Sequence, residues 1–310
     1  MVLPAQFARA LGLTIISEGG KNSGMPIEVA DLCRPGLQFA GYFDVFANER
    51  PQLIGKTEMM YLNNLEDGPR LERLLRYFSY PIPCLVIARG MTCEKTLLEQ
   101  AMAHGVPIYA TQEETSVFTG RAIEYLMEAL APRQTEHGVL LDVFGVGVLI
   151  TGESGVGKSE CALELIKRGH QLVADDVVDI ARVGKQLVGE SPEMVRDFME
   201  LRGIGIVDIK LLFGIGAVLR RKTIDIVVRL EAWTPKRDYD RLGNQEKYME
   251  ILGAKIPLID VPVRSGRNLA IIVEIAARNW RLKGEGYSAV DELDRRLMEH
   301  YGHMSEDNGH

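Results

Sequence analysis

The sequence lacks a long apolar run and a cysteine pair, and both absences limit what the protein can be. No apolar stretch approaches the ~20 residues that a membrane-spanning helix requires, so we expect no membrane segment. The 4 cysteines are scattered without a C-x-x-C spacing, and the N-terminus shows no basic and then apolar secretion signal. We therefore expect reduced thiols and a cytoplasmic location.

Positive charge is also scarce. The chain has 36 lysine and arginine residues against 43 aspartate and glutamate residues, which gives a formal net charge of −7. Overall charge therefore supplies no attraction to nucleic acid or to an anionic membrane, and we expect neither as a partner.

The composition that remains is typical of a globular protein with two domains. The chain has 310 residues, of which 46% are hydrophobic and 25% are charged. Residues 1–130 alternate short apolar stretches with helix-like segments, which predicts a small α/β domain whose role the sequence does not define. Pro132, Gly138 and polar residues mark 131–138 as a linker. We expect a second domain over 131–310, with a disordered polar tail at 302–310.

The second domain begins with a strand, loop, helix and strand in that order. Residues 139–150 are apolar and are interrupted by Gly145 and Gly147, which predicts two strands that meet at a turn, and the second strand, 147–151, runs into a glycine-rich loop. A helix follows over 158–169, and 171–174 is a short apolar strand. Further strands are expected at 204–209, 224–230 and 258–263, followed by a helix at 269–283.

The glycine-rich loop, 152-GESGVGKS-159, matches the G-x-x-x-x-G-K-S/T pattern of a phosphate-binding loop. Glycines let backbone N–H groups turn towards phosphate oxygens, and the N-terminus of the next helix adds partial positive charge. In such loops the lysine reaches the outer phosphates and the hydroxyl binds Mg²⁺. We predict that a nucleotide is held by Gly152, Glu153, Ser154, Gly155, Val156, Gly157, Lys158 and Ser159.

Two adjacent aspartates follow the next strand. A phosphate-binding loop needs one acidic residue near its metal, and either Asp175 or Asp176 suits that role. The other carboxylate can then accept a proton from an incoming hydroxyl group. Aspartate is also common in turns, so a turn-capping role for Asp176 stays open.

These motifs occur with others that together resemble one family. The chain carries E-H-G-V from residue 136, A-D-D from 174, E-L-R-G-I-G-I from 200 and P-V-R-S-G-R-N from 262. With residues 34–47 and 50–62 of the first domain, these stretches resemble the bacterial HPr kinase/phosphorylase family over nearly the whole chain. The resemblance implies a C-terminal P-loop kinase domain related in fold to phosphoenolpyruvate carboxykinase.

The resemblance also implies an activity. Family members use ATP and Mg²⁺ to phosphorylate a serine of the phosphocarrier protein HPr. They remove the group again by phosphorolysis, in which inorganic phosphate attacks and pyrophosphate leaves, and they regulate carbon catabolite repression as homohexamers. These properties are expectations that the resemblance brings to this chain.

The resemblance assigns roles to the aspartate pair and to a histidine. Asp176 matches the acid/base of both reactions, which leaves Asp175 to support the metal and Lys158. His137 matches an active-site histidine, although a histidine in a linker is often simply exposed.

Further assignments rest on single positions. Glu200 matches a second Mg²⁺ contact and Arg241 an active-site arginine, although both residue types are also common at solvated surfaces. Arg264 and Arg267 lie in the segment that the family associates with phosphorolysis. Ser265 stands where family members usually have proline, which puts the strength of the phosphorylase reaction in doubt.

Three classes of function stay open at this point. The first is the bifunctional protein kinase and phosphorylase, the second is a P-loop kinase of a small metabolite, and the third is a nucleotide-binding regulator without phosphoryl transfer. A regulator that only binds nucleotide would need neither Asp176 nor the paired arginines.

Overall fold

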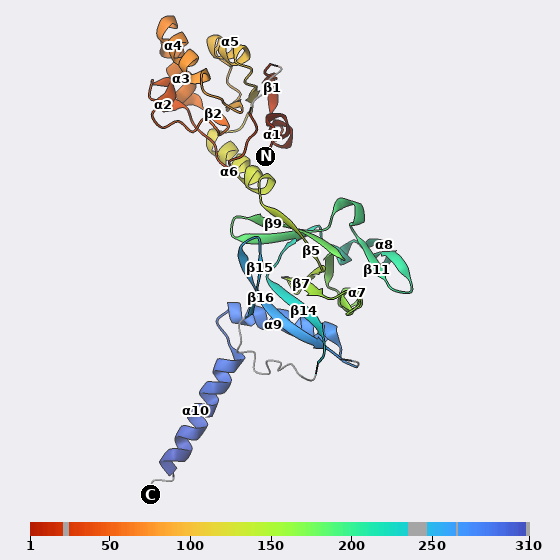
Figure 1. The fold of residues 1–310 in the computed structure, drawn as a ribbon. Coiled ribbons are helices and arrows are strands. Elements are labelled where there is room, and N and C mark those ends of the chain that lie inside the picture. Colours follow the sequence, from red (N-terminus) through yellow and green to blue (C-terminus); the bar gives the residue numbers. More distant parts are fainter. Residues whose placement is uncertain (21–24, 235–246, 265, 308–310) are drawn as a thin grey trace. The chain divides into compact units, whose positions relative to one another are not determined.

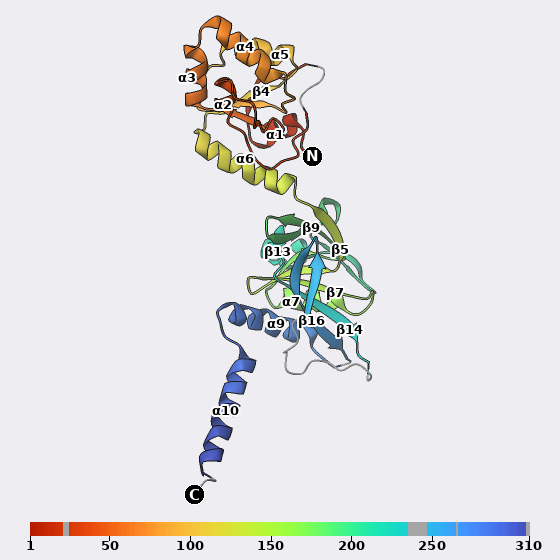
Figure 2. The ribbon, with the colours of Figure 1, turned by 60° about the vertical axis from the view of Figure 1, so that its left-hand side comes forward.

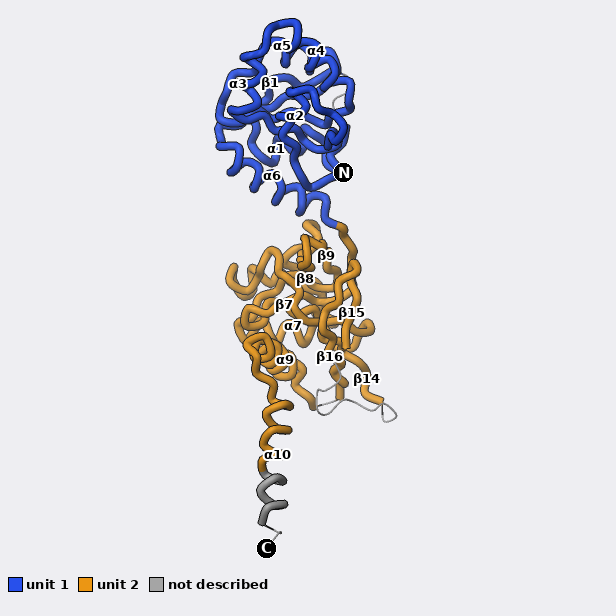
Figure 3. Tube along the Cα trace, turned by 90° about the vertical axis from the view of Figure 1, so that its left-hand side faces the viewer, with its two compact units in different colours: residues 1–131 blue, residues 132–310 orange. Residues whose placement is uncertain are grey.

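The chain forms two compact units, residues 1–131 and residues 132–310 (Figure 3). The computed structural model describes residues 1–20, 25–234, 247–264 and 266–307, with side chains through residue 299. The expected boundary fell after residue 130. Within the described ranges, no helix is both long and apolar enough to cross a bilayer.

Unit 1 is a sheet with helices on both faces (Figure 1). The strand order is β1 (Thr14–Ser17), β4 (Ile108–Ala110), β3 (Leu85–Ile87) and β2 (Gln52–Ile54). The last three are parallel and β1 is antiparallel to β4. Short parallel strands joined by helices are the α/β pattern that the sequence predicts.

Alternating side chains on these strands build a core on each face of the unit 1 sheet. Ile54 and Ile87 pack with four helices, α2 (Gly36–Phe39), α3 (Lys56–Asn64), α4 (Asp67–Phe78) and α5 (Lys95–Ala103). Leu53 and Val86 point the other way, because successive strand residues face opposite sides. They pack with α1 (Pro4–Ala10) and α6 (Thr115–Ala129).

Unit 2 is built on a six-stranded sheet (Figure 2). Its order is β15 (Lys247–Ile251), β16 (Ala254–Val263), β14 (Ile226–Ala232), β7 (Val146–Gly152), β6 (Val139–Val143) and β8 (Gln171–Ala174). The three central strands β16, β14 and β7 are parallel, so their carboxyl ends lie along one edge of the sheet. Ligands of open α/β sheets bind at that edge.

Two different layers cover this sheet. Leu141 of β6 packs with helices α7 (Lys158–Lys167) and α9 (Leu269–Gly284) on one face. Leu140 points to the opposite face and packs with a second sheet. That sheet has the order β13 (Arg221–Thr223), β10 (Gln186–Glu190), β9 (Val177–Val183) and β5 (Arg133–His137).

Small elements complete unit 2. A hairpin of β11 (Phe198–Leu201) and β12 (Gly205–Asp208) precedes helix α8 (Ile209–Phe213). Two 3-10 turns, Glu193–Val195 and Ile215–Ala217, flank these elements, and helix α10 (Ala289–Asp307) follows α9.

The strands expected within 139–150 are confirmed as the hairpin of β6 and β7. Phe144 and Gly145 form its turn with φ angles of 55° and 85°, and positive φ at both central residues matches the twist of a tight hairpin. The helix expected at 158–169 is confirmed as α7, with Gly169 just beyond its end at a φ of 94°. The relation in fold to phosphoenolpyruvate carboxykinase stays a prediction.

Two expectations were wrong. The expected linker 131–138 contains β5, which pairs with β9 over five residues because polar side chains do not prevent backbone pairing. The tail expected to be disordered from residue 302 belongs to helix α10 as far as Asp307. Ion pairs from Arg295 to Glu292 and Glu299 support that helix, since residues three and four apart are neighbours on a helix.

Candidate active site

The glycine-rich loop that the sequence predicts to bind phosphate lies at the carboxyl edge of the unit 2 sheet, between β7 and α7. Gly152 ends β7 with a φ of 140°, and a Cβ atom there would lie 2.4 Å from the carbonyl oxygen of Leu230 in β14. Only glycine fits that position. Gly157 is the N-cap residue of α7 and has a φ of 102°. The first N–H groups of a helix have no intrahelical partner, and in α7 they lie at the end of the loop.

Lys158 folds back over this loop. Its Nζ donates to the carbonyl oxygens of Gly152 at 3.0 Å and Glu153 at 3.1 Å. The ammonium group and the N-terminus of α7 therefore place positive charge on the same short segment, which suits the outer phosphates of a nucleotide.

Asp175 joins α7 to the hairpin of β11 and β12. Its Oδ1 accepts a hydrogen bond from Ser159 Oγ at 3.0 Å, and its Oδ2 accepts one from the backbone N–H of Glu200 at 3.1 Å. The residue is only 7% exposed. Burial raises the pKa of the Asp175 carboxyl and the negative charge of Asp176 adds to the rise, whereas the hydrogen bonds from Glu200 and Ser159 oppose it.

These oxygens fit Mg²⁺ that is shared with a nucleotide. Mg²⁺ in phosphoryl-transfer sites is held by one or two carboxylates together with substrate phosphates. Ser159 and Asp175 supply a hydroxyl and a carboxylate side by side at the loop. Within the described ranges no cluster of three or more His, Cys, Asp or Glu side chains could hold a metal alone. Glu200 reaches Asp175 through its backbone, and its own side chain is exposed.

Asp176 stands at a tight, strained turn. Its φ is 63°, and the N–H of Val177 donates to the carbonyl oxygen of Asp175 at 2.8 Å, which closes a three-residue turn. The Asp176 side chain is exposed, and its carboxylate makes no hydrogen bond or ion pair with any other residue that the structure describes. Strained residues of this kind cluster at functional sites.

His137 lies beside this turn. It is the last residue of β5 and is paired with Val177, the first residue of β9. The N–H of Gly138 donates to the carbonyl oxygen of Asp176 at 3.0 Å, so the two backbones are joined on both sides of the turn. His137 is exposed, as Asp176 is.

An arginine to which the sequence analysis gave no role lies against the loop. Nη2 of Arg202 is 3.3 Å from Ser154 Oγ, and a Cβ atom at Gly155 would lie 2.7 Å from its Nη1. Gly155 therefore leaves room for the guanidinium group. Arg202 lies between β11 and β12, and its position directly before Gly203 was the one sign in the sequence of a role at the site.

The paired arginines follow β16 at the same edge of the sheet. Cζ of Arg264 lies 3.4 Å from the centre of the Trp233 ring, and Nη1 of Arg267 donates to the carbonyl oxygen of Pro262 at 3.1 Å. Sequence reasoning did not identify Trp233. Arg241 and Ser265 lie outside the described residues.

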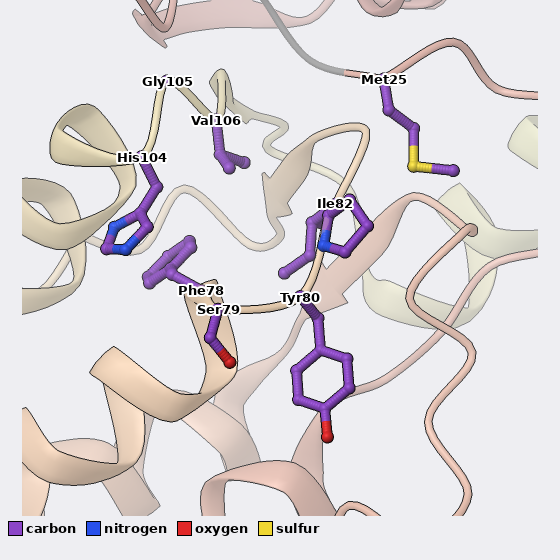
Figure 4. Close-up of a pocket in the computed structure, with 9 residues that line it drawn as sticks. Met25, Phe78, Ser79, Tyr80, Ile82, His104, Gly105 and Val106 are labelled. Carbon is purple, nitrogen blue, oxygen red and sulfur yellow. The ribbon is translucent and has the colours of Figure 1, made fainter.

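Unit 1 contains a separate pocket of about 290 Å³ (Figure 4). Phe78 and His104 line one side of it with their rings stacked at 5.7 Å, and Nδ1 of His104 contacts the carbonyl oxygen of Gln100 at 2.8 Å. The pocket contains none of the residues that the sequence analysis assigned to a site.

Comparisons with known families cover both units. The family described as HPr Serine kinase N terminus matches residues 4–126, and the family described as HPr Serine kinase C-terminal domain matches residues 128–297.

Curated relatives match over most of their length. A protein of Thermoanaerobacter pseudethanolicus named HPr kinase/phosphorylase is 49% identical over 293 residues, 94% of this chain and 96% of the relative. The proteins of the same name from Caldanaerobacter subterraneus and Alkaliphilus metalliredigens are 47% and 50% identical, over 94% and 88% of this chain and 96% and 88% of the relatives.

A solved structure of the Hpr(Ser) kinase/phosphatase from Coxiella burnetii is also similar. It is 41% identical, with a TM-score of 0.47 over 52% of this chain and 98% of that chain. Because both family descriptions and the full-length relatives agree, the chain belongs to the HPr serine kinase family.

Proposed function

We propose that this protein phosphorylates a serine of HPr with ATP and Mg²⁺ and removes the phosphoryl group by phosphorolysis. The observation that carries the proposal is the identity of 47–50% to relatives named HPr kinase/phosphorylase over most of both chains. The loop, the buried Asp175 and the exposed Asp176 supply the groups that such chemistry needs.

In the kinase direction, Asp176 acts as the base. Its carboxylate takes the proton from the serine hydroxyl while the serine oxygen attacks the γ-phosphorus. The bond from the γ-phosphorus to the bridging oxygen breaks, and ADP leaves. Lys158 and the N-terminus of α7 stabilise the negative charge on the transferring group. The charge neutralisation that Mg²⁺ supplies when bound would act beside Ser159 and Asp175.

In the phosphorylase direction, the same groups act in reverse. An oxygen of inorganic phosphate attacks the phosphorus of phosphoserine, the bond to the serine oxygen breaks, and pyrophosphate leaves. Asp176 returns a proton to the serine oxygen. His137, adjacent to the Asp176 turn, orients the attacking phosphate, and Arg264 and Arg267 hold it at the carboxyl end of β16.

We also propose that the protein works as a homohexamer. Several large apolar side chains of the β11–β12 hairpin, helix α8 and the second 3-10 turn are exposed to solvent, as expected of a surface that an assembly buries. Ile204, Ile206, Leu211 and Ile215 are between 73% and 82% exposed. Light scattering of the purified protein would measure the mass of the assembly.

Intact-mass measurement of HPr tests the catalytic proposal. HPr is incubated with the protein and Mg²⁺-ATP, desalted, and then incubated with phosphate. We expect a gain of one phosphoryl group that phosphate then removes, with release of pyrophosphate. If HPr stays unmodified while a small-molecule acceptor is phosphorylated, the chain is a metabolite kinase. Tight ATP binding without any turnover would instead identify a regulator.

A further inference from the structure

Two side chains without a shared sequence motif meet at the carboxyl edge of the unit 2 sheet. The last paired residues of the parallel strands β14 and β16 are Ala232 and Val263, and Trp233 and Arg264 directly follow the two strands. The N–H of Trp233 donates to the carbonyl oxygen of Val263 at 3.3 Å, so the backbones stay together at this point. The register of the two strands therefore fixes the distance between the two side chains.

The Arg264 guanidinium lies over the face of the Trp233 indole. Its Cζ is 3.4 Å from the ring centre, which is the geometry of a cation–π contact. The N–H groups of a guanidinium point outward in its plane, so a ring beneath that plane blocks none of them. Among the residues that the structure describes, Arg264 makes no side-chain hydrogen bond or ion pair. The contact thus holds the group while its donors stay available.

The stacked pair lies on the same edge as the phosphate-binding loop. β14 separates β16 from β7, and Leu230 of β14 pairs with Gly152 at the start of the loop. Gly152 lies opposite Val261 across β14, so two strand spacings of ~4.8 Å and two further residues of ~3.3 Å along β16 put the ends of β7 and β16 about 12 Å apart. That distance places the Arg264 donors within reach of a phosphate that sits next to the transferring group.

We propose that Trp233 is a positioning residue for phosphorolysis: it holds the Arg264 guanidinium flat so that the N–H donors face the attacking phosphate. An unrestrained arginine side chain loses rotamer freedom when it binds an anion, and a stacked one has lost that freedom already. The inference rests on the proposed function, because it concerns the phosphate that phosphorolysis consumes.

Arg267 gives an internal comparison. Its Nη1 is bonded to the carbonyl oxygen of Pro262, and no aromatic ring among the described residues stacks on it. The indole therefore acts on Arg264 alone, and its effect disappears when Arg264 is removed.

The test is the phosphate dependence of phosphorolysis of phosphoserine-HPr. For Trp233→Leu we expect the KM for phosphate to rise about fivefold, from the usual strength of such a contact, with kcat and the KM for ATP in the kinase reaction changed less than twofold. Trp233→Phe keeps an aromatic face and should recover most of the phosphate affinity. Trp280→Phe removes the other tryptophan, which packs against the core from α9, and should leave the phosphate KM unchanged.

A double-mutant cycle with Arg264→Ala separates positioning from a general effect. We expect Trp233→Leu to add less than a twofold rise in phosphate KM when Arg264 is already alanine. Equal losses of the kinase and phosphorylase reactions in Trp233→Leu would overturn this inference and leave the proposed function standing. The same holds if the rises in phosphate KM caused by the two substitutions simply multiply in the double variant. A wild-type protein that phosphorylates HPr but never releases pyrophosphate would overturn the phosphorylase half of the proposed function and this inference with it.

Discussion

Replacement of Asp176 by asparagine separates the chemistry of the site from its fold. Asp176 holds a φ of 63°, and asparagine shares with aspartate the ability to adopt that backbone conformation. The side chain is exposed and has no hydrogen-bonding partner among the described residues. The substitution therefore removes one ionisable oxygen while it keeps the size and the backbone of the turn.

The expected magnitudes differ widely between stability and activity. An exposed isosteric change should alter the free energy of unfolding by less than about 0.5 kcal/mol. Loss of general acid/base help should lower both phosphoryl transfer and phosphorolysis by roughly 10²- to 10⁴-fold, or about 3–5 kcal/mol of activation free energy.

Three measurements on Asp176→Asn give the comparison. Single-turnover phosphorylation of HPr and phosphorolysis of phosphoserine-HPr report the two chemical steps, and equilibrium binding of Mg²⁺-ATP reports the loop. Nucleotide affinity should change little, because the loop contacts of Lys158 and Ser159 do not involve Asp176.

Asp179→Asn is the matched control. Asp179 lies three residues along on β9 and accepts a hydrogen bond from Thr135 Oγ1 at 2.8 Å, away from the loop. It should keep both activities. Activity of Asp176→Asn within tenfold of wild type would contradict the acid/base role, and loss of one reaction without the other would show that the two directions use different groups.

Gly152→Ala should destabilise the protein by about 3 kcal/mol or more in urea unfolding, because its Cβ would meet the carbonyl oxygen of Leu230. Gly157→Ala, whose added carbon would have no atom of a non-adjacent described residue within 4 Å, should cost only about 1–2 kcal/mol of backbone strain, and equal losses for the two variants would contradict the close approach at Gly152. Arg202→Ala should weaken equilibrium ATP binding about tenfold, because its guanidinium group lies against the loop at Ser154 and is expected to contact a bound phosphate; Arg202→Lys should recover part of the affinity, and unchanged affinity would exclude that contact. Burial raises the pKa of Asp175 above 3.8, so its carboxylate is protonated at a higher pH than that of an exposed aspartate. We therefore expect Mg²⁺-dependent ATP binding, measured from about pH 7 down to about pH 4, to weaken as the pH falls through that raised pKa. Affinity lost only below about pH 4 would contradict the shift.

The glycine-rich loop and the elements that flank it could be predicted because their signal is local. The glycines, Lys158 and Ser159 lie within eight residues, and the flanking strand and helix show their own apolar periods. The pair Asp175 and Asp176 was predicted for the same reason. The difference between the two carboxylates, one buried and bonded and the other exposed on a strained turn, required the structure.

Features that depend on strand register could not be predicted. β5 has almost no buried side chain, so its residues carry no apolar alternation, and backbone pairing with β9 alone defines it. Trp233 and Arg264 are distant in sequence and meet only because β14 and β16 are parallel in one particular register. The sequence alone is compatible with several registers between short strands, so it does not select the one register that brings two such side chains together.

The position of His137 has a consequence for the segment that joins the two units. β5 starts at Arg133, directly after the boundary at Ala131 and Pro132, and ends at His137 beside the turn at Asp176. A strand that slips by one residue turns every side chain to its opposite face. We therefore expect the chain to tolerate extra residues before Arg133 far better than a single deletion within β5, because such a deletion would turn the His137 side chain to the opposite face of the strand.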